Sequence, residues 1–170
     1  MPPLSLAPAP LTLRRATTAD EPSIQRLSTS ENMGLLHPLG QTTVAEARGE
    51  DIVGFLRIMC YDECGYVNPI VVSQRYRHQG IGRMLMEQAR SEYGELRFVS
   101  RGTVQEFYRK LGAERIPWDT IAQSVSSDCT ECSMRVTCNP QPMRILGHSS
   151  SHREADDGTN ATASRLCSSK

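Results

Sequence analysis

Residues 67–82, VNPIVVSQRYRHQGIG, run from an apolar strand-like segment through a polar turn to two glycines, Gly80 and Gly82. An apolar stripe at helical spacing follows the glycines and is made of Ile81, Met84, Leu85 and Ala89. The first N–H groups of a helix have no intrahelical acceptor and lie at its positive end, so they bind phosphate groups well. Glycine lets ligand oxygens approach the backbone closely. The order of strand, glycine turn and helix therefore predicts a pyrophosphate site.

Two other phosphate-binding motifs do not match this turn. No Lys-Ser or Lys-Thr pair follows Gly82, as a Walker A loop requires, and the third glycine of a dinucleotide fingerprint is missing. What remains is a short R-x-x-G-x-G, formed by Arg77, Gly80 and Gly82.

This motif, placed after a Val-Val strand, resembles the acetyl-CoA motif of the GCN5-related N-acetyltransferases, the GNAT family. A second segment, 106–112 (EFYRKLG), is similar to the family's FYxKxGF segment, and the resemblance spans residues 12–117 in the expected order. It implies a single α/β domain with a mixed, mainly antiparallel sheet of about six strands. In the family, a cleft for acetyl-CoA opens where the fourth and fifth strands splay apart, and helices flank the sheet.

The resemblance also implies roles for individual residues. Tyr108 is expected to protonate the leaving thiolate, since a phenol with a pKa of about 10 keeps its proton at neutral pH. Asn68 stands near the position where many relatives carry a glutamate base, and it would orient a water or the acceptor amine, because an amide cannot take a proton. The expected acetyl-CoA contacts are Ile70, Val71, Val72, Arg77, His78, Gln79, Gly80, Ile81, Gly82, Arg83 and Arg101.

Three of these assignments have alternatives. Tyr108 also fits a core tyrosine on an amphipathic helix, and Arg83 also fits a solvated surface residue. Glu46, Glu63 and His37 are reserve candidates for the general base.

Periodicity and turn residues place the secondary structure. Strands are predicted at 11–15, 42–47, 52–61, 66–72 and 96–100, with a hairpin turn at 49–51. A helix is predicted after Thr18 and Glu21, which have capping-box spacing, with Ile24 and Leu27 facing inward. A further helix at 104–111 should end at Gly112. The apolar loop 33–40 is expected to shape an acceptor pocket.

Cys129, Cys132 and Cys138 form a C-x2-C-x5-C cluster. The C-x2-C spacing is common in metal knuckles, which makes zinc or iron a possible ligand, with reduced structural thiols or a redox-sensitive pair as the alternatives. Cys60 and Cys64 are expected to be a buried thiol and a turn thiol.

Length and composition predict one domain, residues 11–120, preceded by a disordered leader at 1–10. A cysteine-containing extension at 121–143 and a disordered tail at 144–170 follow. The 19 basic and 19 acidic side chains balance, so neither nucleic acid nor a membrane is an expected partner. The Pro-rich start has no early positive charge, which indicates a cytoplasmic protein with mostly reduced thiols.

The predicted function is direct transfer of an acetyl group from acetyl-CoA to a primary amine of a small molecule or peptide, by a monomer or homodimer. A non-catalytic acyl-CoA-binding module and a metal or redox sensor are the alternatives, and the acceptor cannot be named from the sequence.

Overall fold

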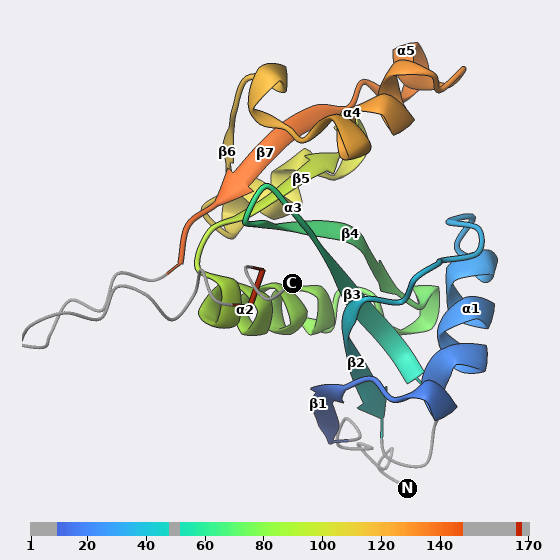
Figure 1. Cartoon of the computed structure of the whole chain (residues 1–170). Helices are drawn as coiled ribbons and strands as arrows, with labels where there is room; N and C mark the ends of the chain where they lie inside the picture. Colours follow the sequence, from blue (N-terminus) through green and yellow to red (C-terminus); the bar gives the residue numbers. More distant parts are fainter. Residues whose placement is uncertain (1–9, 48–51, 148–165, 168–170) are drawn as a thin grey trace, which may run out of the picture. The chain divides into compact units, whose positions relative to one another are not determined.

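The computed structural model describes residues 10–47, 52–147 and 166–167 (Figure 1). The predicted leader, the hairpin turn at 49–51 and most of the predicted tail lie outside these residues. No helix within the described part of the chain has the length and apolar character to cross a membrane.

Within the described residues, seven strands pair in the order β1-β2-β3-β4-β5-β7-β6. They are β1 (Leu11–Arg15), β2 (Gln41–Ala47), β3 (Ile52–Tyr61), β4 (Cys64–Val72), β5 (Leu96–Ser100), β6 (Glu114–Arg115) and β7 (Gln141–Ile145). β4 and β5 pair in parallel, whereas β1–β2, β2–β3, β5–β7 and β6–β7 are antiparallel. The predicted mixed, mainly antiparallel sheet is confirmed, with seven strands instead of about six.

The chain divides into two compact units, and the first comprises Met1–Ile58 and Pro69–Leu85. Its core joins α1 (Glu21–Ser30) to the sheet through Ile24, Leu27, Val44, Ile52, Phe55 and Val71. Ile24 and Leu27 are buried, as predicted. In Figure 1, α1 lies beside β3.

The capping box lies one residue earlier than predicted. The Asp20 carboxylate accepts hydrogen bonds from the Thr17 N–H (2.7 Å) and hydroxyl (3.0 Å), at the start of the 3-10 turn η1 (Thr18–Asp20). Arg14 also donates two hydrogen bonds to Asp20, and these hold the pKa of that carboxyl well below its usual range. The pair fastens the end of β1 to the start of α1.

The second unit comprises Met59–Asn68 and Met86–Lys170. It contains α3 (Gln105–Lys110), α4 (Gln123–Thr130) and α5 (Arg135–Cys138). Tyr66 packs with Ile121, Ala122 and Val125, and its hydroxyl accepts the Ala122 N–H at 3.0 Å. α4 is therefore fixed to β4 by a buried tyrosine.

β6 and β7 fall where no strand was predicted. β7 pairs with β5 from Leu96↔Ile145 to Ser100↔Gln141 and with β6, and its Met143 and Ile145 are fully buried. Pro142 lies in this strand, although proline removes a ladder donor. The long-range pairing with β5 decides the structure of this segment.

The glycine-led helix is α2 (Ile81–Tyr93), and its buried stripe differs slightly from the prediction. Ile81, Leu85 and Ala89 are buried as predicted, together with Met86 and Tyr93, while Met84 is 39% exposed. Arg90, on the same helix, is half-buried. Its guanidinium donates to the carbonyls of Leu111 (3.2 Å) and Leu146 (2.6 Å).

α3 buries a narrower face than its spacing suggested. Tyr108 and Leu111 are buried, whereas Val104 and Phe107 are 42% and 36% exposed. Gly112 follows the helix with φ +88° and donates its N–H to the Arg109 carbonyl, so the predicted helix end is confirmed.

Cys60 forms a disulfide with Cys167. The expectation that Cys60 is a reduced, buried thiol is therefore wrong. The partner was not predictable from spacing, because 107 positions separate the two cysteines in the chain. Cys64, Cys129, Cys132 and Cys138 are free thiols.

Candidate active site

The parallel ladder between β4 and β5 is short. Gly65 pairs with Leu96 and Tyr66 pairs with Arg97, and β4 continues to Val72 beyond them. Pro69 therefore falls past the part of β4 that pairs with β5, while β3 is the neighbour of β4 on its other side. Asn68 is half-buried, one position before this proline.

The end of β4 leads into the predicted phosphate-binding turn. The Ser73 N–H bonds to the Val53 carbonyl at 2.9 Å, and a 3-10 turn, η2 (Gln74–Tyr76), follows. His78 and Gly80 then adopt positive φ values of 62° and 85°. Glycine suits the second position because it takes this conformation without strain.

The first turn of α2 presents unpaired backbone donors. Its first helical hydrogen bond runs from the Met84 N–H to the Gly80 carbonyl at 3.0 Å, so the N–H groups of Ile81, Gly82 and Arg83 precede the helical ladder. A Cβ built on Gly80 would meet no atom within 4 Å, so the space beside it is open. The turn therefore fits a phosphate group in both its donors and its room.

The charged and polar residues predicted around the turn differ in their contacts. The Arg77 guanidinium donates to the Val72 carbonyl at 3.1 Å and forms an ion pair with Glu31. Gln79 donates through its side chain to the Arg75 carbonyl at 3.2 Å. His78 and Arg83 are exposed.

A glycine that was not singled out from the sequence lies under this site. A Cβ on Gly54 of β3 would lie 3.2 Å from Ile81 Cγ2 and 3.2 Å from the Val71 carbonyl oxygen. The end of β4 and the start of α2 thus approach β3 more closely than a side chain would allow. An isolated glycine inside a strand is the sequence signal for such an approach.

In the second unit, Tyr108 lies on α3 with a buried ring. Its ring centroid is 4.5 Å from that of Phe98 and 5.0 Å from that of Phe107. Burial raises the pKa of Tyr108 to about 12, although the charge of Arg101 acts in the opposite direction. The phenol is therefore protonated across the physiological range.

The Tyr108 hydroxyl is accessible although its ring is buried. Within the residues that the structure describes, every buried side-chain nitrogen or oxygen has a hydrogen-bond partner. Among these residues Tyr108 Oη makes no hydrogen bond, so this oxygen is not one of the buried atoms. The oxygen therefore retains some exposed surface.

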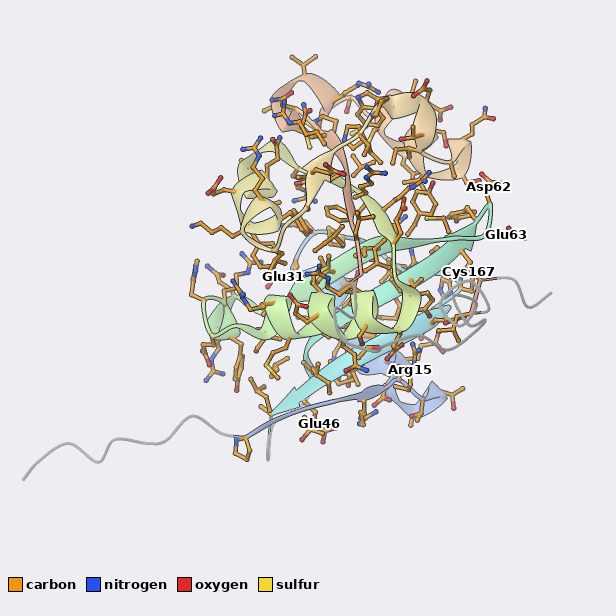
Figure 2. All side chains as sticks on the ribbon, turned by 90° about the vertical axis from the view of Figure 1, so that its left-hand side faces the viewer. Arg15, Glu31, Glu46, Asp62, Glu63 and Cys167 are labelled. Carbon is orange, nitrogen blue, oxygen red and sulfur yellow. A yellow bond between two sulfur atoms is a disulfide. The ribbon has the colours of Figure 1, made fainter. Side chains whose placement is uncertain are left out.

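The three reserve candidates for the general base are either paired with another side chain or exposed. The Glu46 carboxylate pairs with Arg14 at 2.9 Å. Glu63 is exposed in the two-residue turn between β3 and β4, as Figure 2 shows, and His37 is exposed before a cis peptide bond to Pro38. Glu46 is thus committed to an ion pair.

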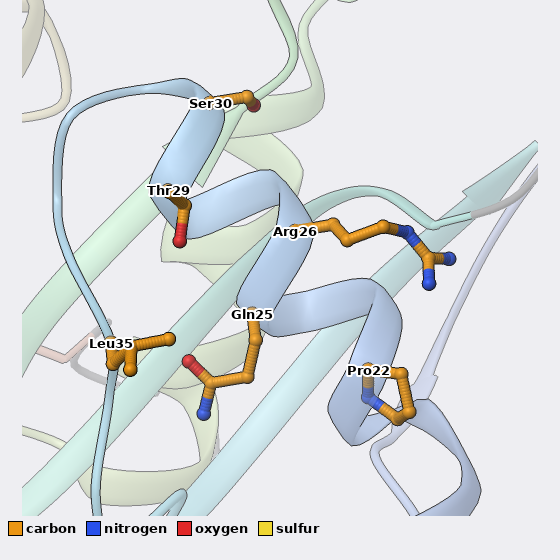
Figure 3. Close-up of a pocket in the computed structure, with 6 residues that line it drawn as sticks. All are labelled: Pro22, Gln25, Arg26, Thr29, Ser30 and Leu35. Atoms are coloured by element: carbon orange, nitrogen blue, oxygen red, sulfur yellow. The ribbon is translucent and has the colours of Figure 1, made fainter.

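The loop predicted to shape the acceptor pocket is fastened to α1. Gln25 exchanges two hydrogen bonds with the Leu36 backbone, at 2.8 and 3.0 Å, and the Ser28 hydroxyl donates to the Gly34 carbonyl at 2.7 Å. An open surface pocket lies over this junction (Figure 3) and is lined by Pro22, Gln25, Arg26, Thr29, Ser30 and Leu35. Leu35 is 72% exposed beside it.

The structure does not assemble the predicted cysteine metal site. Cys129 lies on α4, Cys132 in the following turn and Cys138 at the end of α5. Among the described residues, no group of three or more His, Cys, Asp or Glu is arranged to hold a metal ion. Burial also raises the pKa of the Cys129 thiol, which opposes the thiolate form that a metal requires.

Comparisons with known proteins find similarity to acetyltransferases. Residues 38–112 match the family described as acetyltransferase (GNAT) domain. An uncharacterised N-acetyltransferase from Chlorobaculum tepidum is 28% identical over 100 residues, which cover 56% of this chain and 64% of that protein.

Two solved structures share the fold. N-acetylglutamate synthase from Neisseria gonorrhoeae, complexed with coenzyme A and N-acetyl-glutamate, matches with a TM-score of 0.65 and 18% identity over 84% of this chain and 36% of that one. Rv2747 from Mycobacterium tuberculosis, in complex with CoA and NLQ, matches with a TM-score of 0.58 and 19% identity over 79% and 98%.

The chain thus spans less than two thirds of the curated relative and about a third of the synthase chain. The matched segment contains both the glycine-led turn and Tyr108. Residues 38–112 of this chain are therefore similar to the acetyltransferase (GNAT) domain, and the solved structures share its fold.

Proposed function

We propose that this protein is an N-acetyltransferase that moves an acetyl group from acetyl-CoA to a primary amine by direct attack. The observation that carries the proposal is the open turn at Gly80, beside three backbone N–H groups at the start of α2. Such a group of donors binds a diphosphate well, because it meets several oxygens at the positive end of a helix.

The residues assigned to acetyl-CoA fall into two groups. His78, Gln79, Gly80, Ile81 and Gly82 would hold the diphosphate through the backbone, with Arg83 adding an exposed positive charge, and Arg101 is a further candidate contact. Backbone N–H groups of Ile70, Val71 and Val72 would polarise the thioester carbonyl. Bound acetyl-CoA supplies an activated acyl group, whose transfer leaves a thiolate.

Tyr108 would give its proton to that thiolate. A phenol with a pKa of about 12 stays protonated at neutral pH, and the accessible hydroxyl can donate it. Asn68 would orient the acceptor or a water. The amine must lose a proton to attack, and Asn68 cannot accept it.

The acceptor class is proposed from the relatives. The synthase from Neisseria gonorrhoeae is named for N-acetylglutamate, which makes amino acids and peptide N-termini the first amines to test. Loop 33–40 would form part of the acceptor site, since α1 holds it in place. The proposed location is the cytoplasm, and the proposed assembly is a monomer or homodimer.

An acceptor screen tests the activity. Purified protein is incubated with acetyl-CoA and a panel of amino acids, polyamines and peptides, and CoA and acetylated amines are quantified by chromatography and mass spectrometry. Amine-dependent CoA release is expected. In Tyr108→Phe, kcat should fall about tenfold to a hundredfold while the Kd for CoA stays unchanged. Full turnover by this variant would remove the assigned role of Tyr108.

The second candidate is a non-catalytic acyl-CoA-binding module, and Asn68 is the residue that favours it. In that case CoA would bind by calorimetry, and no amine in the panel would be acetylated. Asn68→Glu would then be the variant to assay, because it places a carboxylate where relatives carry a base.

A further inference from the structure

We propose that Glu31 is a positioning residue for the diphosphate-binding turn, and that Arg77 organises this turn instead of contacting the phosphates. This inference rests on the proposed binding of acetyl-CoA. It changes the role that the family motif implies for Arg77, and it adds a residue that lies 46 positions earlier in the chain.

Glu31 receives two donors from the segment that precedes the glycines. Its Oε1 accepts the Gln74 backbone N–H at 3.2 Å, and its Oε2 accepts a hydrogen bond from the Arg77 guanidinium. Gln74 is the first residue of η2, so its N–H has no partner within that turn. The Glu31 side chain is only 18% exposed, which strengthens the pair relative to a fully solvated one.

Arg77 connects the ends of two elements. Its Nε donates to the carbonyl of Val72, the last residue of β4, while its Nη2 reaches Glu31 at the C-terminus of α1. A planar guanidinium suits this bridge, because its donors point in fixed, divergent directions. We call the three residues Glu31, Arg77 and Val72 the turn clamp.

The turn clamp holds the chain immediately before the two residues with positive φ. His78, with φ 62°, follows Arg77 directly, and Gly80 comes two residues later. Holding Arg77 therefore determines where the chain enters the turn, and so where the N–H groups of Ile81 and Gly82 point. Two of the Arg77 donors are already engaged, so its charge is directed to Glu31.

Glu31 does not stabilise the helix α1 at whose end it lies. Glu31 is the residue that caps the C-terminus of α1. A negative charge there opposes the helix dipole, so the helix alone would favour a neutral or basic residue. Replacing Glu31 should consequently not harm α1, and losses in its variants can be assigned to the turn.

Calorimetry with CoA tests the clamp on the full chain. We compare wild type with Glu31→Ala, Glu31→Gln, Arg77→Ala and Arg77→Lys, and measure KM for acetyl-CoA and kcat in parallel. Glu114→Gln is the matched control, since it removes an exposed ion pair with Arg144 on β6 and β7. Circular dichroism checks that each variant is folded.

If the turn clamp exists, the Kd for CoA should be about tenfold higher in Glu31→Ala than in wild type. The KM for acetyl-CoA should rise by a similar factor, and kcat should stay within about twofold of wild type. Arg77→Lys should resemble Arg77→Ala, because one ammonium cannot span both acceptors. The double variant Glu31→Ala, Arg77→Ala should be no weaker than either single one, since both changes break one unit. The salt dependence of CoA binding should be unchanged in Arg77→Ala, because no phosphate contact is lost.

Opposite results would reject the clamp. If Arg77 contacts phosphate, Arg77→Lys keeps most of the affinity, Arg77→Ala loses salt dependence, and Glu31→Ala binds CoA as well as wild type or better. If Glu31→Ala fails to fold, the Kd for CoA of Glu31→Gln and of the double variant tests the turn clamp in its place. Wild type that binds CoA without turnover contradicts the proposed activity alone, whereas wild type that does not bind CoA contradicts both proposals.

Discussion

Packing sets the protonation state of Tyr108, the residue proposed as the acid. Its ring lies against Phe98 and Phe107, and burial makes the phenolate unfavourable. Because its pKa is raised to about 12, the alkaline fall in activity below pH 10 should come from groups other than Tyr108.

The same shift predicts a pH dependence of stability. An unfolded tyrosine ionises at about pH 10, whereas folded Tyr108 keeps its proton until about pH 12. The unfolded state therefore binds fewer protons in this window, and the free energy of unfolding falls as pH rises through it, by about 2 to 3 kcal/mol.

Urea unfolding between pH 9 and 12 measures this effect. The decline should be smaller in Tyr108→Phe than in wild type, since the variant has no phenol to ionise. Tyr61→Phe, which changes a half-buried tyrosine, serves as the control. If the free energy of unfolding declines equally in wild type and Tyr108→Phe, folding does not hinder the ionisation of Tyr108.

Gly54 gives a second test at a single position. In Gly54→Ala the new methyl would lie 3.2 Å from the Val71 carbonyl oxygen and Ile81 Cγ2, so β4 or α2 must shift. We expect stability to fall by about 1 to 3 kcal/mol and KM for acetyl-CoA to rise.

Gly65→Ala is the matched control for this variant. Its methyl would lie 3.2 Å from Leu96 and 3.3 Å from Tyr93, both of them side-chain atoms in the second unit. A similar loss of stability without a change in KM is expected. Equal effects of both variants on KM would mean that Gly54 has no special link to the site.

The hairpin between β3 and β4 is built from unfavourable residues. Asp62 and Glu63 form its two-residue turn, with φ values of 50° and 60°, at a tip that Figure 2 shows. A type I′ turn needs positive φ at both positions and prefers Asn-Gly. These residues consequently strain the hairpin.

Replacing both turn residues should therefore stabilise the protein. Asp62→Asn combined with Glu63→Gly should raise the free energy of unfolding by about 1 kcal/mol, as measured by urea denaturation. Asp62→Ala with Glu63→Ala should give no gain, because alanine also resists positive φ. Turnover should be retained, and its loss would instead identify Glu63 as the base.

The Cys60–Cys167 disulfide bears on the stability of the whole chain. It closes a loop of 107 residues, and a link of this length restricts the unfolded state strongly. Reduction should lower the free energy of unfolding by about 2 to 4 kcal/mol.

Denaturation with and without a reductant measures this contribution. Cys167→Ser should behave like reduced wild type and should not respond to the reductant, while Cys132→Ser, which removes an exposed thiol, should respond fully. Alkylation of all six cysteines in unreduced wild type would contradict the disulfide.

Local patterns predicted most of the first hundred residues well. Strands at 11–15, 52–61 and 96–100 have the predicted bounds, because alternation and turn residues are local signals. β6, β7, α4 and α5 had no such signals. β7 contains Pro142 and only five residues, and its pairing with β5 supplies what its own sequence does not.

The sequence by itself determined which chemical groups the candidate site contains. These are Gly80 and Gly82 before a helix, Tyr108 in a second motif, and the amide of Asn68 near the position where the family resemblance implies a base. Those features depend on residue types and short spacings, which a chain displays directly. Only the tertiary structure decided the contacts that cross the chain, namely Glu31 with Arg77, Gly54 under Val71, and Cys60 with Cys167. These contacts depend on packing, because side chains distant in sequence meet only after the elements that carry them have folded together.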